Sequence, residues 1–358
     1  MAFQGKVLVT GGAGYLGSVI VETLLAQGAP VVVLDNLTYS AGGIAHLLDH
    51  PGLELIEGDI RDPVVLARAV ANVRCVIHLA AIANDPSGAL DPELTRSVNY
   101  EAYFTLLDAA RRAGVQRFLN ASSFSVYGCG GERELTEEHP LNPLKEYSVC
   151  KALSEEVVRN FASPEFITTS LRCATICGWS RRMRFDLIAN TLTAHAVKKR
   201  HLIVMGGDQE RPQIHIQDLA DLFIALLEAP PDLIRGDVFN AGGPNVSILE
   251  IAELARNIVG HHVELELAPP RHDERSYHVS SEKLSRVLGL RARRDLGDAM
   301  RGIVHAYQQG WWQDPEEARY HNVRWMTRLR SGGCDGDSIS PCRVAPAAGA
   351  QTGATGRG

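Results

Sequence analysis

The sequence lacks the features that mark membrane, secreted and metal-dependent proteins. None of its apolar runs reaches the roughly 20 residues needed to span a bilayer, and the opening MAFQG shows no signal-peptide pattern. Its seven cysteines are an odd number without CxxC spacing, and its Cys, His, Asp and Glu residues form no cluster at metal-ligand spacing. We therefore expect a cytoplasmic protein with reduced thiols, no membrane partner and no metal.

The sequence also lacks an excess of positive charge. It has 36 Lys and Arg against 42 Asp and Glu, a formal net charge of −6, so nucleic acid is not an expected partner. Hydrophobic residues make up 45% of the 358 residues, and this length suits two domains or one elaborate α/β unit. Large apolar residues become rare over 331–358, which predicts a disordered tail.

The first half alternates short apolar runs with amphipathic stretches, a pattern that predicts βα units and a parallel sheet. The expected strands are 6–10, 30–34, 53–57, 75–79, 118–122 and 167–172. The expected helices are 15–27, 63–71, 92–113, which Gly114 would end, and 147–161.

After residue 172 strands become fewer, and helices are expected at 187–199, 248–258 and 282–288. Residues 213–228 and 237–240 are expected to return to the first sheet. The sequence therefore predicts a dinucleotide-binding domain over 1–172 with 213–240, and a smaller substrate-binding region over 173–212 and 241–330.

A glycine-rich loop, TGGAGYLG, lies between the first predicted strand and the first predicted helix. Gly11 permits a tight turn, Gly14 lets the backbone approach a pyrophosphate, and Gly17 allows close helix packing. An ordinary flexible turn is the alternative for the glycines alone. Asp35, which follows Gly17 by 18 positions, favours the dinucleotide interpretation because its carboxylate suits both hydroxyls of a ribose.

The same carboxylate would repel a 2′-phosphate, and Asn36 and Leu37 supply no cation, so NAD is expected rather than NADP. Asp59 and Ile60 close the third strand, where an adenine could be received. A surface aspartate in a turn is the competing interpretation.

Tyr147 and Lys151 are four residues apart, so they lie on one face of the predicted helix. An ammonium beside a phenol stabilises the phenolate, which suits a group that accepts a proton from a hydroxyl. Ser122 and Ser123 fall at the carboxyl end of the fifth strand, where ligands of parallel sheets gather. We expect Ser123 to be catalytic, and Ser122 to pack or contact the cofactor.

The sequence resembles the extended short-chain dehydrogenase/reductase family of nucleotide-sugar epimerases and dehydratases. The resemblance rests on the order of these motifs together with HLAA at 78–81, Asn99, SSFSVYG at 122–128 and the segment 211–220. The resemblance covers residues 5 to about 310, and its catalytic string is most similar to the 4-epimerases. It implies an α/β fold with a Rossmann-type doubly wound parallel sheet and a smaller α/β substrate-binding region.

The resemblance also implies site residues. The catalytic residues would be Ser123, Tyr147 and Lys151. The NAD site would comprise Gly11, Gly14, Tyr15, Leu16, Gly17, Asp35, Asn36, Asp59, Ile60, Leu79, Ala80, Ala81, Asn99, Ser122, Tyr147 and Lys151. The nucleotide-diphosphate sugar would contact Ser123, Thr175, Asn190, Arg211 and Arg275, with Arg271 as the competitor of Arg275. Thr175 stands where 4-epimerases more often carry Asn, which leaves sugar recognition open.

Phe124 and Ser125 narrow the expected reaction. Dehydratases of this family place Asp-Glu at these two positions, and the glucuronate decarboxylases place Glu at the second. We therefore expect C4 epimerisation through a transient 4-keto sugar, with Tyr147 as acid and base. A net NAD-dependent oxidoreductase, acting as a 4-ketoreductase or a C4 dehydrogenase, is the alternative, and a non-catalytic NAD-binding protein is a third.

Three further features of the sequence bear on assembly, phosphate binding and packing. The resemblance implies a homodimer that pairs the helices 92–113 and 147–161. The basic run 181–184 either attracts a phosphate or is a solvated surface. Trp311, Trp312 and Trp325 predict an aromatic cluster, with packing favoured over ligand stacking.

Overall fold

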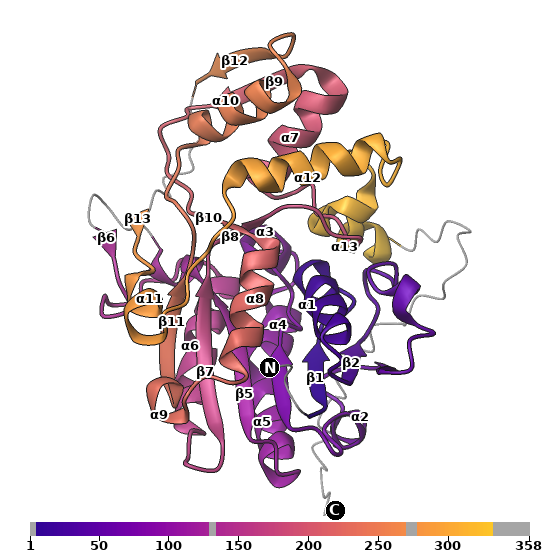
Figure 1. Cartoon of the computed structure of the whole chain (residues 1–358), viewed down its shortest axis with the longest axis vertical. Helices are drawn as coiled ribbons and strands as arrows, with labels where there is room; N and C mark the ends of the chain where they lie inside the picture. Colours follow the sequence, from indigo (N-terminus) through magenta and orange to yellow (C-terminus); the bar gives the residue numbers. More distant parts are fainter. Residues whose placement is uncertain (1–4, 129–133, 270–277, 332–358) are drawn as a thin grey trace, which may run out of the picture.

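The computed structural model describes residues 5–128, 134–269 and 278–331. Its centre is a seven-stranded parallel sheet in the order β11-β7-β5-β4-β1-β2-β3 (Figure 1). The strands are β1 (Val7–Thr10), β2 (Val31–Asp35), β3 (Leu53–Glu57), β4 (Cys75–His78), β5 (Arg117–Ser123), β7 (Ile167–Cys173) and β11 (Asp237–Ala241). The order reverses between β1 and β4, which opens a crevice at their carboxyl ends. The predicted Rossmann-type sheet is confirmed.

Helices cover both faces of this sheet because its strands are apolar on both sides. Along β1, Val7 and Val9 pack with α1, α8 and α11, whereas Leu8 packs with α2, α5 and α6 on the opposite face. The helices of these two layers are α1 (Tyr15–Ala26), α8 (Ile216–Leu226), α11 (Glu282–Leu288), α2 (Pro63–Ala69), α5 (Ala102–Arg112) and α6 (Glu146–Asn160). Three short helices join them: α3 (Asp85–Gly88), α4 (Pro92–Arg96) and α9 (Pro231–Ile234).

The helix predicted over 92–113 is not one regular α-helix. The π-helical turn η2 (Ser97–Glu101) separates α4 from α5, so the prediction of one continuous α-helix was wrong. The turn contains Asn99, whose side chain bonds both backbone polar groups of Ile82. Gly114, at φ +79°, follows the helix end as predicted.

The second region has a core of its own beyond one end of the sheet (Figure 1). Here α7 (Ile188–Lys199), α10 (Ile248–Val259) and α12 (Leu296–Gln308) share a core with one face of the parallel pair β9 (His201–Met205) and β12 (Glu264–Ala268). Ser247 and Glu250 form a capping box that starts α10. The helices expected at 187–199, 248–258 and 282–288 are therefore present.

The segment 213–240 divides between two places. β10 (Gln213–His215) pairs with β8 (Thr175–Cys177) in a separate sheet. The prediction that this segment returns to the first sheet was therefore wrong. β11 does join that sheet, beside β7, and α8 packs on the same face as α1. The division of the chain into two domains stays a prediction.

The remaining elements are β6 (Glu134–Leu135), which pairs with β13 (His278–Val279), the 3-10 turns η1 (Ala45–Leu47), η3 (Phe124–Tyr127) and η4 (Ala318–Tyr320), and α13 (Asn322–Arg330). Figure 1 shows α13 between α12 and the α1–β2 side of the sheet. No helix in the described ranges combines the length and apolar character that crossing a membrane requires.

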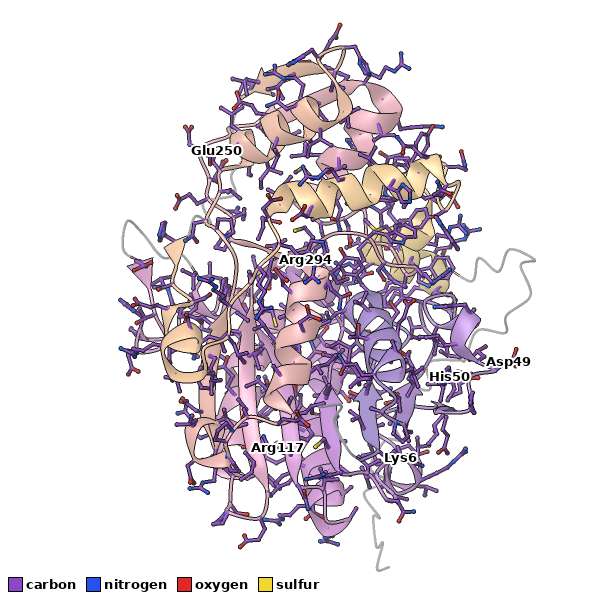
Figure 2. All side chains as sticks on the ribbon, in the orientation of Figure 1. Lys6, Asp49, His50, Arg117, Glu250 and Arg294 are labelled. Carbon is purple, nitrogen blue, oxygen red and sulfur yellow. The ribbon has the colours of Figure 1, made fainter. Side chains whose placement is uncertain are left out.

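The two regions are joined by buried polar contacts. The backbone N–H groups of Arg293 and Arg294 both donate to Oδ2 of Asp218, which is 3% exposed on α8. The Arg294 guanidinium bonds Oδ1 of the same carboxylate, and Figure 2 shows Arg294 at the α12 end of α8. The chain that enters α12 is thereby fixed to the sheet layer.

Candidate active site

One cavity of about 1330 Å³ runs from the sheet crevice to the second region. The predicted site residues in its wall are Gly11, Gly14, Tyr15, Leu16, Gly17, Asp35, Asn36, Asp59, Ile60, Leu79, Ala80, Ala81, Ser122, Ser123, Tyr147, Lys151, Thr175 and Arg211. Asn99 and Asn190 are not in this wall. Arg275 and its competitor Arg271 lie outside the described residues.

The glycine loop leaves no room for side chains. A Cβ on Gly17 would lie 2.2 Å from the carbonyl oxygen of Gly11, and one on Gly11, at φ +72°, would lie 2.8 Å from the backbone nitrogen of Ala80. The N-cap Gly14 brings no side-chain cap, so the first N–H groups of α1 face the cavity for an anion.

Thr10 ties this loop to the next wall segment. Its hydroxyl donates 2.7 Å to Nδ1 of His78 and accepts the backbone N–H groups of Leu79 and Ala80 at 3.3 Å. Burial lowers the pKa of His78 to about 3, so this imidazole is neutral and structural. The turn after β4 is therefore held beside the turn after β1.

Asp35 ends β2 with its carboxylate in the cavity wall. Oδ2 accepts the N–H of Ala13 at 3.0 Å, and Oδ1 accepts that of Leu37 at 2.9 Å. Burial raises the pKa of Asp35, and these two hydrogen bonds oppose the rise. Each oxygen keeps a second acceptor site, as a ribose diol requires.

Asp59 is held by Arg61 at the neighbouring strand end, with 2.6 Å between Nη2 and Oδ2. Partial burial acts to raise the pKa of Asp59, but the hydrogen bonds from Arg61 outweigh it and the pKa is lowered. Asp59 is therefore an ionised cavity-wall group with a cation already beside it.

The Tyr147 phenol faces the same cavity from the first turn of α6. Burial raises its pKa, a hydrogen bond with Ser123 acts to lower it, and the Asp85 charge raises it further. Ser123 Oγ also accepts the N–H of Ser125 at 3.2 Å, which fixes the hydroxyl at the end of β5. The pair can exchange a proton with a hydroxyl bound between them.

Lys151 lies one helical turn beyond Tyr147 and is 4% exposed. Its ammonium donates 2.6 Å to the carbonyl oxygen of Ala121, and burial lowers its pKa to about 8. Farther along α6, Glu155 accepts 2.5 Å from the Ser122 hydroxyl and pairs with the buried Arg172 at 2.8 Å. The Ser122 hydroxyl is thus committed to Glu155, although the residue lines the cavity.

The basic run 181–184 is largely buried. Arg182 and Arg184 are 6% and 8% exposed and line the cavity, which decides against the solvated-surface alternative for both. Arg182 stacks over Tyr39 with its Cζ 4.4 Å from the ring centroid, and Arg184 pairs with Asp186 at 2.9 Å. Burial lowers the pKa of Arg182 to about 10, so the group keeps its positive charge at neutral pH.

Asn190 and Asn99 have partners within the protein that explain their absence from the wall. Asn190 Oδ1 accepts the N–H of Gly178, and its Nδ2 donates to the Tyr15 hydroxyl and to the carbonyl oxygen of Arg184. Asn190 therefore joins the glycine-loop helix to the second region, where the sequence predicted a phosphate contact. Asn99 is committed to the backbone of Ile82, which lines the cavity.

Sequence reasoning missed Asp85, a cavity-wall carboxylate whose charge acts on Tyr147. Its predecessor Asn84 caps α3 at φ 78° and ψ 156°, a conformation that favours glycine and costs energy for asparagine. The Asn-Asp-Pro pattern after β4 was the available signal, since Asn followed by Pro near the first turn marks a helix start. Within the described ranges no three His, Cys, Asp or Glu side chains are grouped to hold a metal ion.

Known proteins are similar to this chain in sequence and in fold. The chain is 33% identical over 310 residues to the low-salt glycan biosynthesis protein Agl12 of Haloferax volcanii, covering 84% of this chain and 98% of that protein. It is 30% identical over 300 residues to a UDP-glucose 4-epimerase of Corynebacterium glutamicum, covering 79% and 90%. The structure of the dTDP-glucose 4,6-dehydratase DesIV of Streptomyces venezuelae, with NAD bound, is 27% identical, with a TM-score of 0.76 over 87% of this chain and 100% of that one.

A family model agrees with these relatives. The model described as the NAD dependent epimerase/dehydratase family matches residues 7–242, from β1 past the end of β11. The glycine cradle, the open start of α1 and Asp35 fit an NAD cofactor. The chain belongs to the NAD dependent epimerase/dehydratase family of nucleotide-sugar enzymes.

Proposed function

We propose that the protein interconverts the C4 epimers of a nucleoside-diphosphate sugar and regenerates its own NAD in each turnover. One observation carries the proposal: Ser123, Tyr147 and Lys151 line the same cavity as the glycine loop and Arg211. A proton-transfer group, a cofactor cradle and a cation for phosphate therefore face one space.

Tyr147 is the group that moves the hydroxyl proton. With a sugar bound, the C4 hydroxyl lies between Ser123 and Tyr147, and the phenolate form of Tyr147 takes its proton. When bound, NAD supplies a reversible acceptor for the C4 hydride. Lys151 stabilises the phenolate by its charge, because the ammonium is held on the same face of α6 and cannot turn to solvent.

The return step needs the sugar to present its other face. The cavity of about 1330 Å³ leaves room for the ring to turn while its diphosphate stays bound. Arg211 is the predicted phosphate contact that lines the wall, and Thr175 and Ile176 on β8 border the same end. Tyr147 then returns its proton to the C4 oxygen of the opposite epimer.

Cations in the wall explain how an acidic chain attracts two anionic molecules. Arg182 and Arg184 are held in place by Tyr39 and Asp186, so little side-chain freedom is lost when a phosphate binds. These groups and the α1 N-terminus place positive charge in the cavity wall of a chain with a net charge of −6.

Asp85 favours one second candidate, a 4,6-dehydration. That reaction needs a proton-transfer group besides the tyrosine, and Phe124 and Ser125 supply none. The Asp85 carboxylate lines the cavity close enough to Tyr147 to act on its pKa. In this alternative Asp85 would take the proton from C5, next to the C4 ketone, and give a proton to the C6 hydroxyl, which leaves as water. C6 would receive the hydride from the reduced cofactor, when bound.

Incubation with UDP-, dTDP-, GDP- and CDP-sugars in deuterium oxide separates the candidates. Epimerisation gives the C4 epimer without deuterium on carbon and without an absorbance rise at the nicotinamide band. Dehydration gives a 4-keto-6-deoxy sugar with deuterium on carbon. A net oxidoreductase gives NADH in proportion to product, and a non-catalytic protein leaves every sugar unchanged.

The homodimer expected from the resemblance stays a prediction. Phe104 on α5 is 46% exposed, and its ring contacts Tyr100 at 5.5 Å between centroids. An exposed apolar ring on the helix pair for which the resemblance implies dimerisation supports a dimer contact there. Light scattering on the purified protein tests it, with a Phe104→Glu variant expected to be monomeric.

A further inference from the structure

We propose that α13 is a strap that closes the cofactor end of the cavity and sets the rate at which NAD leaves. The helix lies 80 residues beyond the segment that the family model matches. This inference concerns cofactor exchange and stands whichever sugar reaction the enzyme catalyses.

The strap belongs to the cavity wall. Four residues of α13 line the cavity, together with Asn36, Thr38 and Tyr39 from the loop that follows Asp35. The α13 residues are Asn322, Met326, Leu329 and Arg330. The helix therefore covers the space next to the carboxylate that suits the cofactor ribose.

The first anchor of α13 is a buried polar network. Asn322 is 3% exposed, its Oδ1 accepts 2.6 Å from Arg182, and its N–H donates 3.1 Å to Asp186. Both partners line the cavity. The start of the strap is thereby tied to the basic wall of the second region.

The other two anchors reach loops on opposite sides of the sheet crevice. The Trp325 indole N–H donates 2.6 Å to the carbonyl oxygen of Thr38, in the loop after β2. The Arg330 guanidinium donates 2.6 Å to the carbonyl oxygen of Leu90 and pairs with Asp91, beyond α3. Because β2 and β4 lie on either side of β1, a helix that bonds both loops crosses the mouth between them.

The anchors differ in strength, and this makes the strap releasable. The Asn322 network is buried, whereas the Arg330 side chain is 49% exposed and its ion pair contributes little in water. The far end of α13 can detach while its start stays fixed. Release of NAD therefore follows the loss of the Trp325 and Arg330 bonds.

This arrangement fits a cofactor that stays bound. An enzyme that returns its hydride within each cycle has no need to exchange NAD, whereas a net oxidoreductase must exchange it in every turnover. A closed strap would slow the second kind of enzyme.

The test uses the full chain loaded with radiolabelled NAD, without sugar. Release is followed by adding excess unlabelled NAD and measuring the label retained over time. The variant Trp325→Phe/Arg330→Gln removes both outer bonds with little change in packing, and we expect it to release NAD about tenfold faster than the unchanged protein. Arg324→Ala is the control. Its guanidinium bonds Glu316, which does not line the cavity, so the release rate of this variant should equal that of the unchanged protein.

Equal release rates in the double variant and the unchanged protein would overturn the strap, and so would complete exchange within seconds in the unchanged protein. Epimerisation is assayed on the same preparations. Absent epimerisation with slow NAD release would count against the proposed function and leave the strap standing.

Discussion

The Lys151 ammonium donates a 2.6 Å hydrogen bond to the carbonyl oxygen of Ala121, on the strand that carries Ser123. Only 4% of Lys151 is exposed, and burial lowers its pKa to about 8. The protein thus keeps a charged amine at a buried position, where an apolar side chain would pack without the free-energy cost of burying a charge. This is expected of a group retained for chemistry.

Replacing Lys151 by Met should therefore stabilise the fold in a pH-dependent way. Between about pH 8 and the ordinary lysine value of 10.5 the unfolded chain holds this proton and the folded chain does not, so wild-type stability rises with pH in that window. Below pH 8 the full cost, about 3 kcal/mol, is present. The advantage of Lys151→Met in urea unfolding should be larger at pH 7 than at pH 10.5 by about this amount. An advantage that does not change with pH would show that burial does not lower the pKa of Lys151 in the folded protein.

Tyr147→Phe removes the proton-transfer group and keeps the ring. Turnover should fall by about 10²–10⁴-fold, whereas bound NAD should be retained, because the phenyl ring fills the same wall. Tyr100→Phe is the matched control, since Tyr100 is not in the cavity wall, and its turnover should equal that of the unchanged protein. Unimpaired turnover of Tyr147→Phe would refute the proposed chemistry.

Glu155→Gln should destabilise the protein strongly. Glu155 and Arg172 are 4% and 3% exposed, so the substitution leaves a buried guanidinium without its counter-charge, at a cost of about 3–5 kcal/mol. Asp108→Asn, which breaks the exposed pair with Arg112, should change the free energy of unfolding by less than about 1 kcal/mol. Thermal or urea unfolding measures both, and similar small effects would mean that the buried pair is not formed.

Gly17→Ala should prevent NAD binding. The new Cβ would meet the carbonyl oxygen of Gly11 at 2.2 Å, and backbone cannot give way there without opening the phosphate loop. We expect a loss of about 1–3 kcal/mol in stability and a protein purified without nicotinamide absorbance. Gly302→Ala, in helix α12, has its nearest contact at 3.8 Å and should be neutral or slightly stabilising. NAD retention in Gly17→Ala would contradict the assignment of the loop.

Local patterns predicted the parallel sheet, and together with the family resemblance they named site residues of which most line the cavity. Strands such as β1 are short apolar runs, Asp35 ends the apolar run of β2, and Tyr147 lies in the first turn of α6. The turn chemistry that starts α3, and with it Asp85, was present in the sequence but was not recognised.

What could not be predicted depends on contacts between distant parts of the chain. In the sequence, Asn190 is a polar residue that a ligand could contact. In the structure its Nδ2 donates a hydrogen bond to the hydroxyl of Tyr15, 175 positions earlier. The position of α13 depends on the Trp325 bond to Thr38, which spans 287 positions. No local periodicity carries such information.

The most direct test of the internal redox cycle follows a nucleotide sugar that carries deuterium at C4. The position of the deuterium in the product and the amount of NADH formed by the purified enzyme are measured. We predict that deuterium at C4 is returned to C4 of the opposite epimer within one active site, while NADH does not accumulate. Loss of that deuterium to released NADH, or its appearance at C6 of a 4-keto sugar, would contradict it.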